Sequence, residues 1–250
     1  MAVKHLLILG GTAEARELAR RVAITIPKKV RVTTSLAGRR AKAPALPGDV
    51  RIGGFGGLDG LVDYINENAI DLVIDATHPF SAIISDHANA AAEATGVPRL
   101  QLLRPLWQLP PTAKWIEVDD LTDAARDLPR FAKRVFLTTG VRSLEAFSGL
   151  DDIWFLVRLM DPPAEPPPLA QLELIIGKPP YSFEDERAIL ADHNIDTLVT
   201  KNSGGDGTEA KVFAAAEAGV KIILIRRPPP EPGPVVETVD DAFAWIESQV

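Results

Sequence analysis

The feature that most constrains the fold is a regular alternation of short apolar runs with longer amphipathic segments. The strands expected in the first part of the chain are residues 5–9, 30–34, 50–52, 71–75 and 97–103. Apolar residues recur at helical spacing between them, first at Ala15, Leu18, Ala19, Val22 and Ala23. Because neighbouring parallel strands need a helical crossover, this alternation predicts right-handed βαβ units and an α/β fold.

The alternation breaks once and then resumes. Prolines interrupt both periods at Arg104-Pro105 and at residues 109–112, which indicates a linker. The strands expected beyond it are residues 114–118, 134–138, 153–159, 172–176, 197–200 and 221–225. Helices are expected at 183–193, at 208–218 and at the end of the chain, where Val239, Ala242, Phe243 and Ile246 share one face.

This organisation predicts two Rossmann-like lobes, each a parallel sheet flanked by helices, with the active-site cleft between them. Residues 1–108 are expected to form an NADP-binding domain, and residues 112–250 a second α/β domain that binds substrate.

Composition excludes several function classes. The 250 residues include no cysteine, which rules out disulfides, thiolate nucleophiles and Cys-ligated metal. The four histidines are too dispersed for a metal motif, and there is no G-x-S-x-G elbow or Walker-type G-K-[ST]. The net charge of −7, with both signs interspersed, does not indicate nucleic-acid binding. No apolar stretch reaches membrane-spanning length, so a cytoplasmic protein with no metal and no membrane or nucleic-acid partner is expected.

A glycine-rich turn follows the first expected strand. Gly10, Gly11, Thr12, Ala13 and Glu14 lie where a strand meets a helix N-terminus, whose free N–H groups bind phosphate. Against the pattern G-x-G-x-x-G/A, the chain has Thr12 at the second glycine and Ala15 at the third position. The departure keeps an anion site, in which the Thr12 hydroxyl could donate to a phosphate oxygen. The alternative is a plain glycine-rich βα turn.

The segment after the second strand favours NADP over NAD. NAD sites place a carboxylate there for the ribose 2′-hydroxyl, whereas this chain reads Thr34-Ser35-Leu36-Ala37-Gly38-Arg39-Arg40. Thr34 is included in the cofactor site, and Ser35 and Arg39 are assigned to the 2′-phosphate; a solvated basic loop is the alternative.

Two further loops face the same expected crevice. Gly54, Phe55 and Gly56 belong to a glycine-rich loop after the third strand, either beside the cofactor or as a turn with Phe55 packed in the core. Ala76, Thr77 and His78 follow the fourth strand and are also assigned to the cofactor. His78 is a candidate catalytic donor because histidine titrates near neutrality; alternatively it caps the next helix.

The second lobe carries polar loops at two strand ends. They concentrate hydroxyls, N–H donors and cations suited to an anionic ligand. The substrate-binding candidates are Thr139, Gly140, Arg142, Lys201, Asn202, Ser203 and Gly204, together with Arg104 and Tyr181. Lys201 is a candidate general acid or a charge contact.

Taken together, these motifs resemble the precorrin-6A reductase family. The segments that carry the resemblance, in order along nearly the whole chain, are 9–16, 34–39, 53–57, 75–80, 104–107 and 201–205. The resemblance implies NADPH-dependent reduction of a macrocycle double bond of precorrin-6A, giving precorrin-6B in cobalamin biosynthesis. It also implies an anionic tetrapyrrole substrate and transient contact with neighbouring pathway enzymes.

Three alternatives stay open. The chain could be a cobalt-precorrin-6A reductase of the anaerobic route, or a reductase or epimerase of a smaller substrate. The latter would be supported by a Tyr-x-x-x-Lys pair, which is not present. It could also be a non-catalytic NADP-sensing module, against which the second set of polar strand-end loops argues.

Overall fold

The computed structural model describes residues 2–37 and 46–250. The chain divides into two compact units. The first joins Met1–Pro105 with Pro228–Val250, and the second is Leu106–Arg227.

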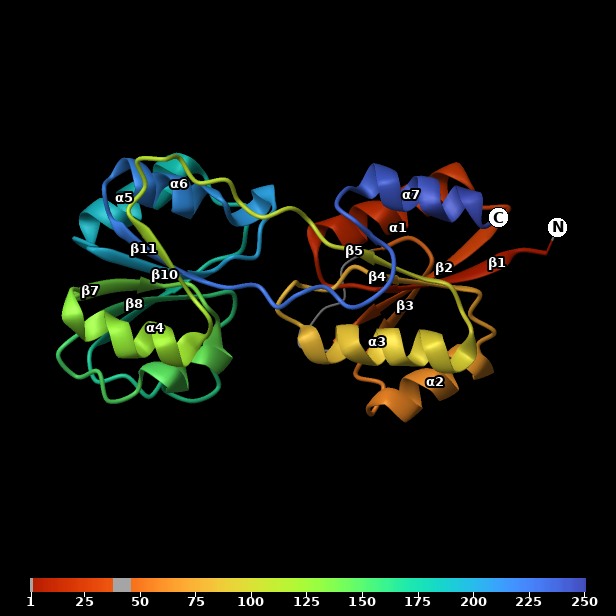
Figure 1. Cartoon of the computed structure of the whole chain (residues 1–250), viewed down its shortest axis with the longest axis horizontal. Helices are drawn as coiled ribbons and strands as arrows, with labels where there is room; N and C mark the ends of the chain where they lie inside the picture. The colour runs from red at the N-terminus through yellow and green to blue at the C-terminus, as the bar shows by residue number, and fades with distance from the viewer. Residues whose placement is uncertain (1, 38–45) are drawn as a thin grey trace. The chain divides into compact units, whose positions relative to one another are not determined.

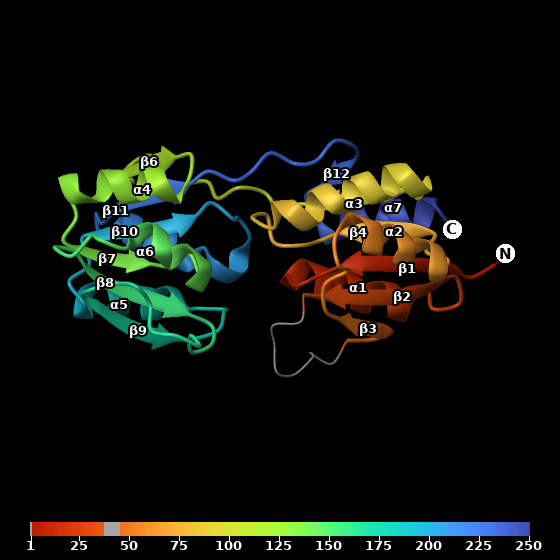
Figure 2. The ribbon, with the colours of Figure 1, turned by 90° about the horizontal axis from the view of Figure 1, so that it is seen from below.

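The first unit is built on a six-stranded parallel sheet in the order β12-β5-β4-β1-β2-β3. Its strands are β1 (Lys4–Leu9), β2 (Val30–Leu36), β3 (Asp49–Ile52), β4 (Leu72–Asp75), β5 (Arg99–Leu102) and β12 (Val235–Val236). Figure 2 shows β12 and β3 at opposite edges of this sheet. The central strands are apolar on both sides because helices cover both faces.

Helices flank both faces of this sheet. α1 (Ala13–Thr25) and α7 (Val239–Ser248) lie on one face, and α2 (Leu58–Glu67) and α3 (Ala82–Thr95) on the other (Figure 1). The helical spacing read from the sequence buries Leu18 and Val22 of α1 against the same core as Phe243 and Ile246 of α7.

The second unit repeats this plan with the strand order β6-β11-β10-β7-β8-β9, again parallel. Its strands are β6 (Trp115–Val118), β7 (Arg134–Leu137), β8 (Trp154–Leu159), β9 (Leu172–Ile176), β10 (Thr197–Lys201) and β11 (Lys221–Ile225). The helices are α4 (Leu121–Asp127), α5 (Phe183–Asp192), α6 (Ala210–Glu217) and the 3₁₀ turns η1 (Leu128–Arg130), η2 (Val141–Phe147) and η3 (Asp206–Thr208). Helices α5 and α6 cover one face of the sheet and α4 the other (Figure 1).

Both sheets reverse their strand order at one point. In the first unit the reversal falls between β1 and β4, and in the second between β7 and β10. Ligands of open α/β sheets bind at such points, outside the carboxyl ends of the strands. Each unit therefore has one preferred crevice, and the polar loops noted in the sequence follow these four strands.

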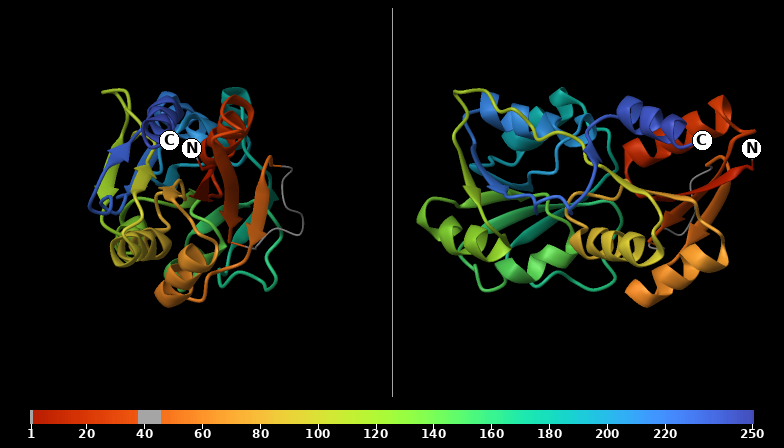
Figure 3. Two further views of the ribbon diagram at one scale, coloured as in Figure 1. Left: turned by 90° about the vertical axis from the view of Figure 1, so that its right-hand side faces the viewer. Right: turned by 45° about the vertical axis from the view of Figure 1, so that its right-hand side comes forward.

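The α/β fold with two parallel sheets is confirmed, but the predicted extent of the second domain is not what the structure shows. The chain crosses into the second unit at Leu106, close to the expected boundary, and residues 228–250 return to the first unit. There Val235 and Val236 of β12 pair with Gln101 and Leu102 of β5. The reason is physical: β5 is fully buried and needs a further strand at its edge, and α1 needs an apolar cover, which α7 supplies. Both chain ends lie in this unit (Figure 3).

Candidate functional site

The first crevice is shaped by Gly10 and Gly11. A Cβ on Gly10 would lie 3.1 Å from Thr34 Cγ2, so a larger residue after β1 would have to displace the Thr34 side chain slightly. Gly10 N–H also donates to Ser35 O (2.9 Å). Gly11 has a φ of +124°, which other residues rarely adopt, and a side chain there would project into open space. The turn thus brings bare backbone to the start of α1.

Thr12 has a different role from the one predicted for its hydroxyl. It is the N-cap of α1: its Oγ1 accepts a hydrogen bond from Ala15 N–H (3.1 Å) and donates to Ala76 O (2.7 Å). The hydroxyl proton is therefore committed to the backbone after β4 and does not point to a phosphate. The first-turn N–H groups, including those of Ala13 and Glu14, have no acceptor within the helix, and such groups are suited to binding an anion.

Glu14 and Arg104 form an ion pair in this crevice. The carboxylate lies 3.2 Å from Arg104 Nη1, and both side chains are largely buried. A depression beside the pair is lined by Thr12, Glu14, Thr77, Pro79, Leu102 and Arg104. Arg104, predicted to contact substrate, therefore lies with the residues predicted to contact the cofactor.

The loop after β4 is held by Asp75. This buried carboxylate accepts hydrogen bonds from the Thr77 N–H (3.1 Å) and hydroxyl (2.7 Å), so it fixes the start of the loop. His78 is exposed, and its Nδ1 accepts a hydrogen bond from Phe80 N–H (3.2 Å) in the turn before α3. The N-cap of α3 is Ser81, so His78 braces the turn and not the helix itself.

A positively charged side chain that was not predicted from the sequence, that of Arg51, lies at the carboxyl ends of β2 and β3. Arg51 lies opposite Ser35 in the sheet register, and its Nη1 is 3.4 Å from Ser35 Oγ. It donates to Gly53 O (2.6 Å) and Gly54 O (2.8 Å). A single arginine before a glycine-rich run carries no motif; only the register of β3 against β2 could have pointed to it.

The remaining residues predicted to bind the cofactor differ in their surroundings. Thr34 is fully buried with its methyl group against the Gly10 backbone, so it shapes the turn from beneath. Phe55 packs edge-on against Tyr64 with a ring separation of 5.2 Å, as in the packing alternative. Gly54 and Gly56 are exposed in that loop. Arg39 lies outside the described residues.

In the second unit, Thr139 and Asn202 lie at the point where the strand order reverses. Ser143 Oγ lies within hydrogen-bonding distance of both Thr139 Oγ1 (2.6 Å) and Gly140 O (2.5 Å). Asn202 is 7% exposed, and among the described residues its Oδ1 has no hydrogen-bond partner. Such a buried amide oxygen at a strand end is suited to a ligand donor.

The side chain of Arg227, which was not predicted from the sequence to take part in a site, holds the loop after β10. Arg227 donates to Ser203 O (2.9 Å) and to Asn202 O (3.3 Å), and Gly204 follows in the same loop. Burial lowers the pKa of Lys201, the last residue of β10. Arg142 is exposed in η2.

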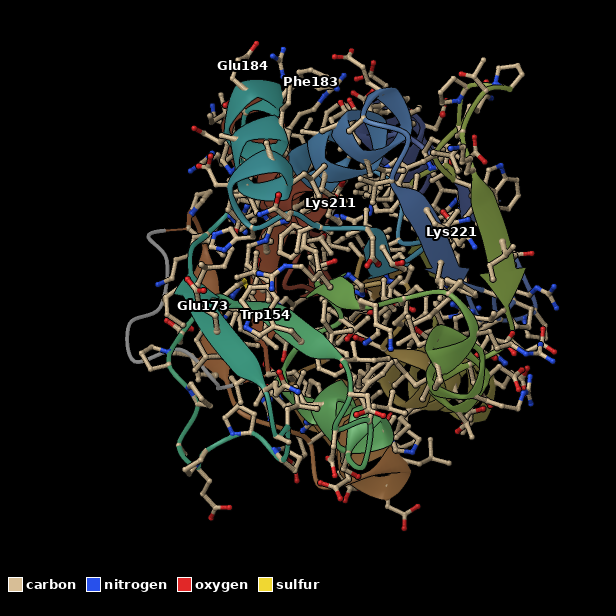
Figure 4. All side chains as sticks on the ribbon, turned by 90° about the vertical axis from the view of Figure 1, so that its left-hand side faces the viewer. Trp154, Glu173, Phe183, Glu184, Lys211 and Lys221 are labelled. Atoms are coloured by element: carbon tan, nitrogen blue, oxygen red, sulfur yellow. The ribbon has the colours of Figure 1, made fainter. Side chains whose placement is uncertain are left out.

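Tyr181 belongs to a buried charged cluster. Its ring lies 3.9 Å from Arg158 Cζ, and Arg158 pairs with Glu186 at 2.8 Å with both side chains buried. Burial raises the pKa of the Tyr181 hydroxyl and of the Glu186 carboxyl, while Arg158 opposes the shift in both. Lys211 of α6, labelled in Figure 4, donates to Thr208 O (2.6 Å) and lies over the Trp107 ring.

The described part of the chain shows neither a cluster of metal ligands nor a membrane-spanning helix. Within residues 2–37 and 46–250, no three His, Asp or Glu side chains gather as a metal site would require. Over the same residues, no helix combines the length and the apolar character needed to cross a membrane.

The residues of the first crevice fit a nicotinamide dinucleotide. The turn at Gly10 and Gly11 leaves room for a phosphate, the start of α1 supplies N–H donors, and Ser35 stands at the end of β2 in place of a carboxylate.

The comparisons with known proteins agree over nearly the whole chain. The family model described as precorrin-6x reductase CbiJ/CobK matches residues 5–247. The chain is 47% identical over 248 residues to a precorrin-6A reductase of Rhodococcus erythropolis, covering 97% of each chain. It is 30% identical over 264 residues to a cobalt-precorrin-6A reductase of Priestia megaterium, covering 98% of each. A solved CobK precorrin-6A reductase superposes with a TM-score of 0.92 at 38% identity, covering 99% of this chain and 97% of the other.

Proposed function

The chain belongs to the precorrin-6x reductase family, a family of oxidoreductases that act on a CH–CH group, and from this premise we propose that it reduces precorrin-6A to precorrin-6B with NADPH. One observation carries the proposal: the likeness to precorrin-6A reductases extends across both units. Identity is higher to the relatives named for precorrin-6A, at 39–47%, than to those named for cobalt-precorrin-6A, at 30–31%. This difference favours the cobalt-free substrate.

The assignment of NADPH rests on the first crevice. Bound NADPH would supply a hydride to one carbon of the macrocycle double bond, while a proton completes the reduction at the other. The N–H groups at the start of α1, reinforced by the helix dipole, hold the pyrophosphate. Ser35, at the end of β2, receives the adenosine ribose without the carboxylate that would favour NAD.

The assignment of the tetrapyrrole rests on the second unit. Its peripheral carboxylates are received by the loops that hold Thr139 and Gly140, and Asn202 to Gly204, with Arg142 nearby. Lys201 is the proton donor in this proposal, because burial brings its pKa down toward the working pH. His78, exposed beside the cofactor loop, is the other candidate donor. The protein works in the cytoplasm, in passing contact with the enzymes before and after it.

The test is the loss of NADPH absorbance when purified protein meets precorrin-6A, with NADH and cobalt-precorrin-6A in parallel reactions. Rapid loss with NADPH and precorrin-6A, and slow loss with NADH, is the expected result. Faster turnover of the cobalt-containing ring would move the protein to the anaerobic route. NADPH binding without turnover of either ring would instead support a nucleotide sensor.

A further inference from the structure

Arg51 lies where a bound adenosine ribose would meet the sheet. It is the residue before the last of β3, and the register places it opposite Ser35 at the carboxyl end of β2. In Rossmann-like sheets the end of this second strand reads the ribose 2′ position. Arg51 therefore stands on the next strand outward from that position, with its guanidinium reaching back toward Ser35.

The guanidinium is held in place before any ligand arrives. The carbonyl groups of Gly53 and Gly54 accept from its two terminal nitrogens, and Phe55 lies beneath it at 3.9 Å from ring centroid to Cζ. The Tyr64 ring adds a second aromatic contact at 5.1 Å. An arginine ordered in this way loses little conformational entropy when it binds a phosphate. Its N–H donors outnumber the three acceptors that it contacts among residues 2–37 and 46–250.

The charge of Arg51 has no acidic partner in the part of the chain that the structure describes. The nearest acid along β3, Asp49, is instead paired with Arg31 at 2.8 Å. A guanidinium without a carboxylate beside a ribose site attracts an anion there, and a 2′-phosphate is the group that distinguishes NADPH from NADH.

We propose that Arg51, together with the Ser35 hydroxyl, binds the 2′-phosphate of the cofactor and sets the preference of the enzyme for NADPH. The inference rests on the nicotinamide cofactor of the proposed function and names the residue that selects its phosphorylated form. The glycine-rich loop after β3 then has a definite role, since its carbonyl groups aim the arginine.

The experiment compares two nucleotides that differ only in the 2′-phosphate, adenosine 2′,5′-bisphosphate and adenosine 5′-monophosphate, by calorimetric titration. Arg51→Gln is expected to bind the bisphosphate about 10- to 100-fold more weakly, with little change for the monophosphate, because one charge-assisted contact is lost. Arg51→Lys is expected to fall between, because lysine keeps the charge and loses the planar fork. The matched control is Arg31→Gln, an exposed arginine of the same sheet paired with Asp49, which should change neither affinity.

Equal weakening of both nucleotides would overturn the proposal, because Arg51 would then only hold the loop. Unchanged affinity for the bisphosphate would overturn it as well. If Arg51→Gln does not fold, Arg51→Lys tests the proposal instead, through the ratio of its affinities for the bisphosphate and the monophosphate. If only the proposed function fails, the protein will still bind the bisphosphate selectively through Arg51, but it will not reduce precorrin-6A. Conversely, turnover with an undiminished NADPH preference in Arg51→Gln would remove this inference alone.

Discussion

At the scale of single residues, Lys201 links stability to function. Burial lowers its pKa from the usual 10.5, so at neutral pH the folded protein carries the cost of a partly buried ammonium group. Natural chains retain such groups where a site needs them. The proposed contact with an anionic substrate, or the transfer of a proton to it, is a reason to keep a cation at this strand end.

The sign of the resulting pH dependence is fixed. Between the lowered pKa and 10.5 the unfolded chain holds a proton that the folded protein has released, so the free energy of unfolding rises with pH across that window. Lys201→Met removes this contribution. The variant should therefore be more stable than the parent at neutral pH, with the difference shrinking as the pH approaches 10.5. Urea unfolding of both proteins across this pH range measures it, and a pH-independent difference would contradict it.

At the scale of elements, the start of α1 depends on one hydroxyl. Thr12 caps the helix and ties it to the backbone after β4, so Thr12→Ala should lower the free energy of unfolding by about 1 kcal/mol. Thr12→Ser keeps the hydroxyl and should lose much less. Because the phosphate is assigned to backbone N–H groups, the NADPH affinity of folded Thr12→Ala should stay close to that of the parent. Denaturant unfolding and NADPH titration measure the two effects, and a large loss of affinity without loss of stability would restore the hydroxyl as a phosphate ligand.

The elements were largely predictable because their signals are local. The predicted strands at residues 172–176 and 221–225 agree with β9 and β11 to the residue, since apolar β-branched runs bounded by turns leave little choice. The two-residue β12 has no such run, and its pairing with β5 is decided by a contact distant in sequence. Arg51 was missed for the same reason: its role comes from the register between β2 and β3, which periodicity does not contain.

At the scale of the whole molecule, α7 ties the stability of the first unit to the end of the chain. Phe243 is almost fully buried against the core that includes α1, so Phe243→Ala should lower the free energy of unfolding by about 3–5 kcal/mol. Hydrogen exchange should show the loss in β1 and β2, with protection of β7 and β10 retained. The matched variant in the second unit is Phe147→Ala, which should produce the opposite pattern. Equal loss in both units for either variant would mean that the two unfold as one.

The return of residues 228–250 to the first unit also determines which unit is completed first during synthesis. Domains of a growing chain ordinarily fold in the order in which they leave the ribosome. Here β5 meets its outer neighbour β12, and α1 its cover α7, only after residues 106–227 have been translated. The unit that begins first is thus finished last, after every residue of the second unit has been translated.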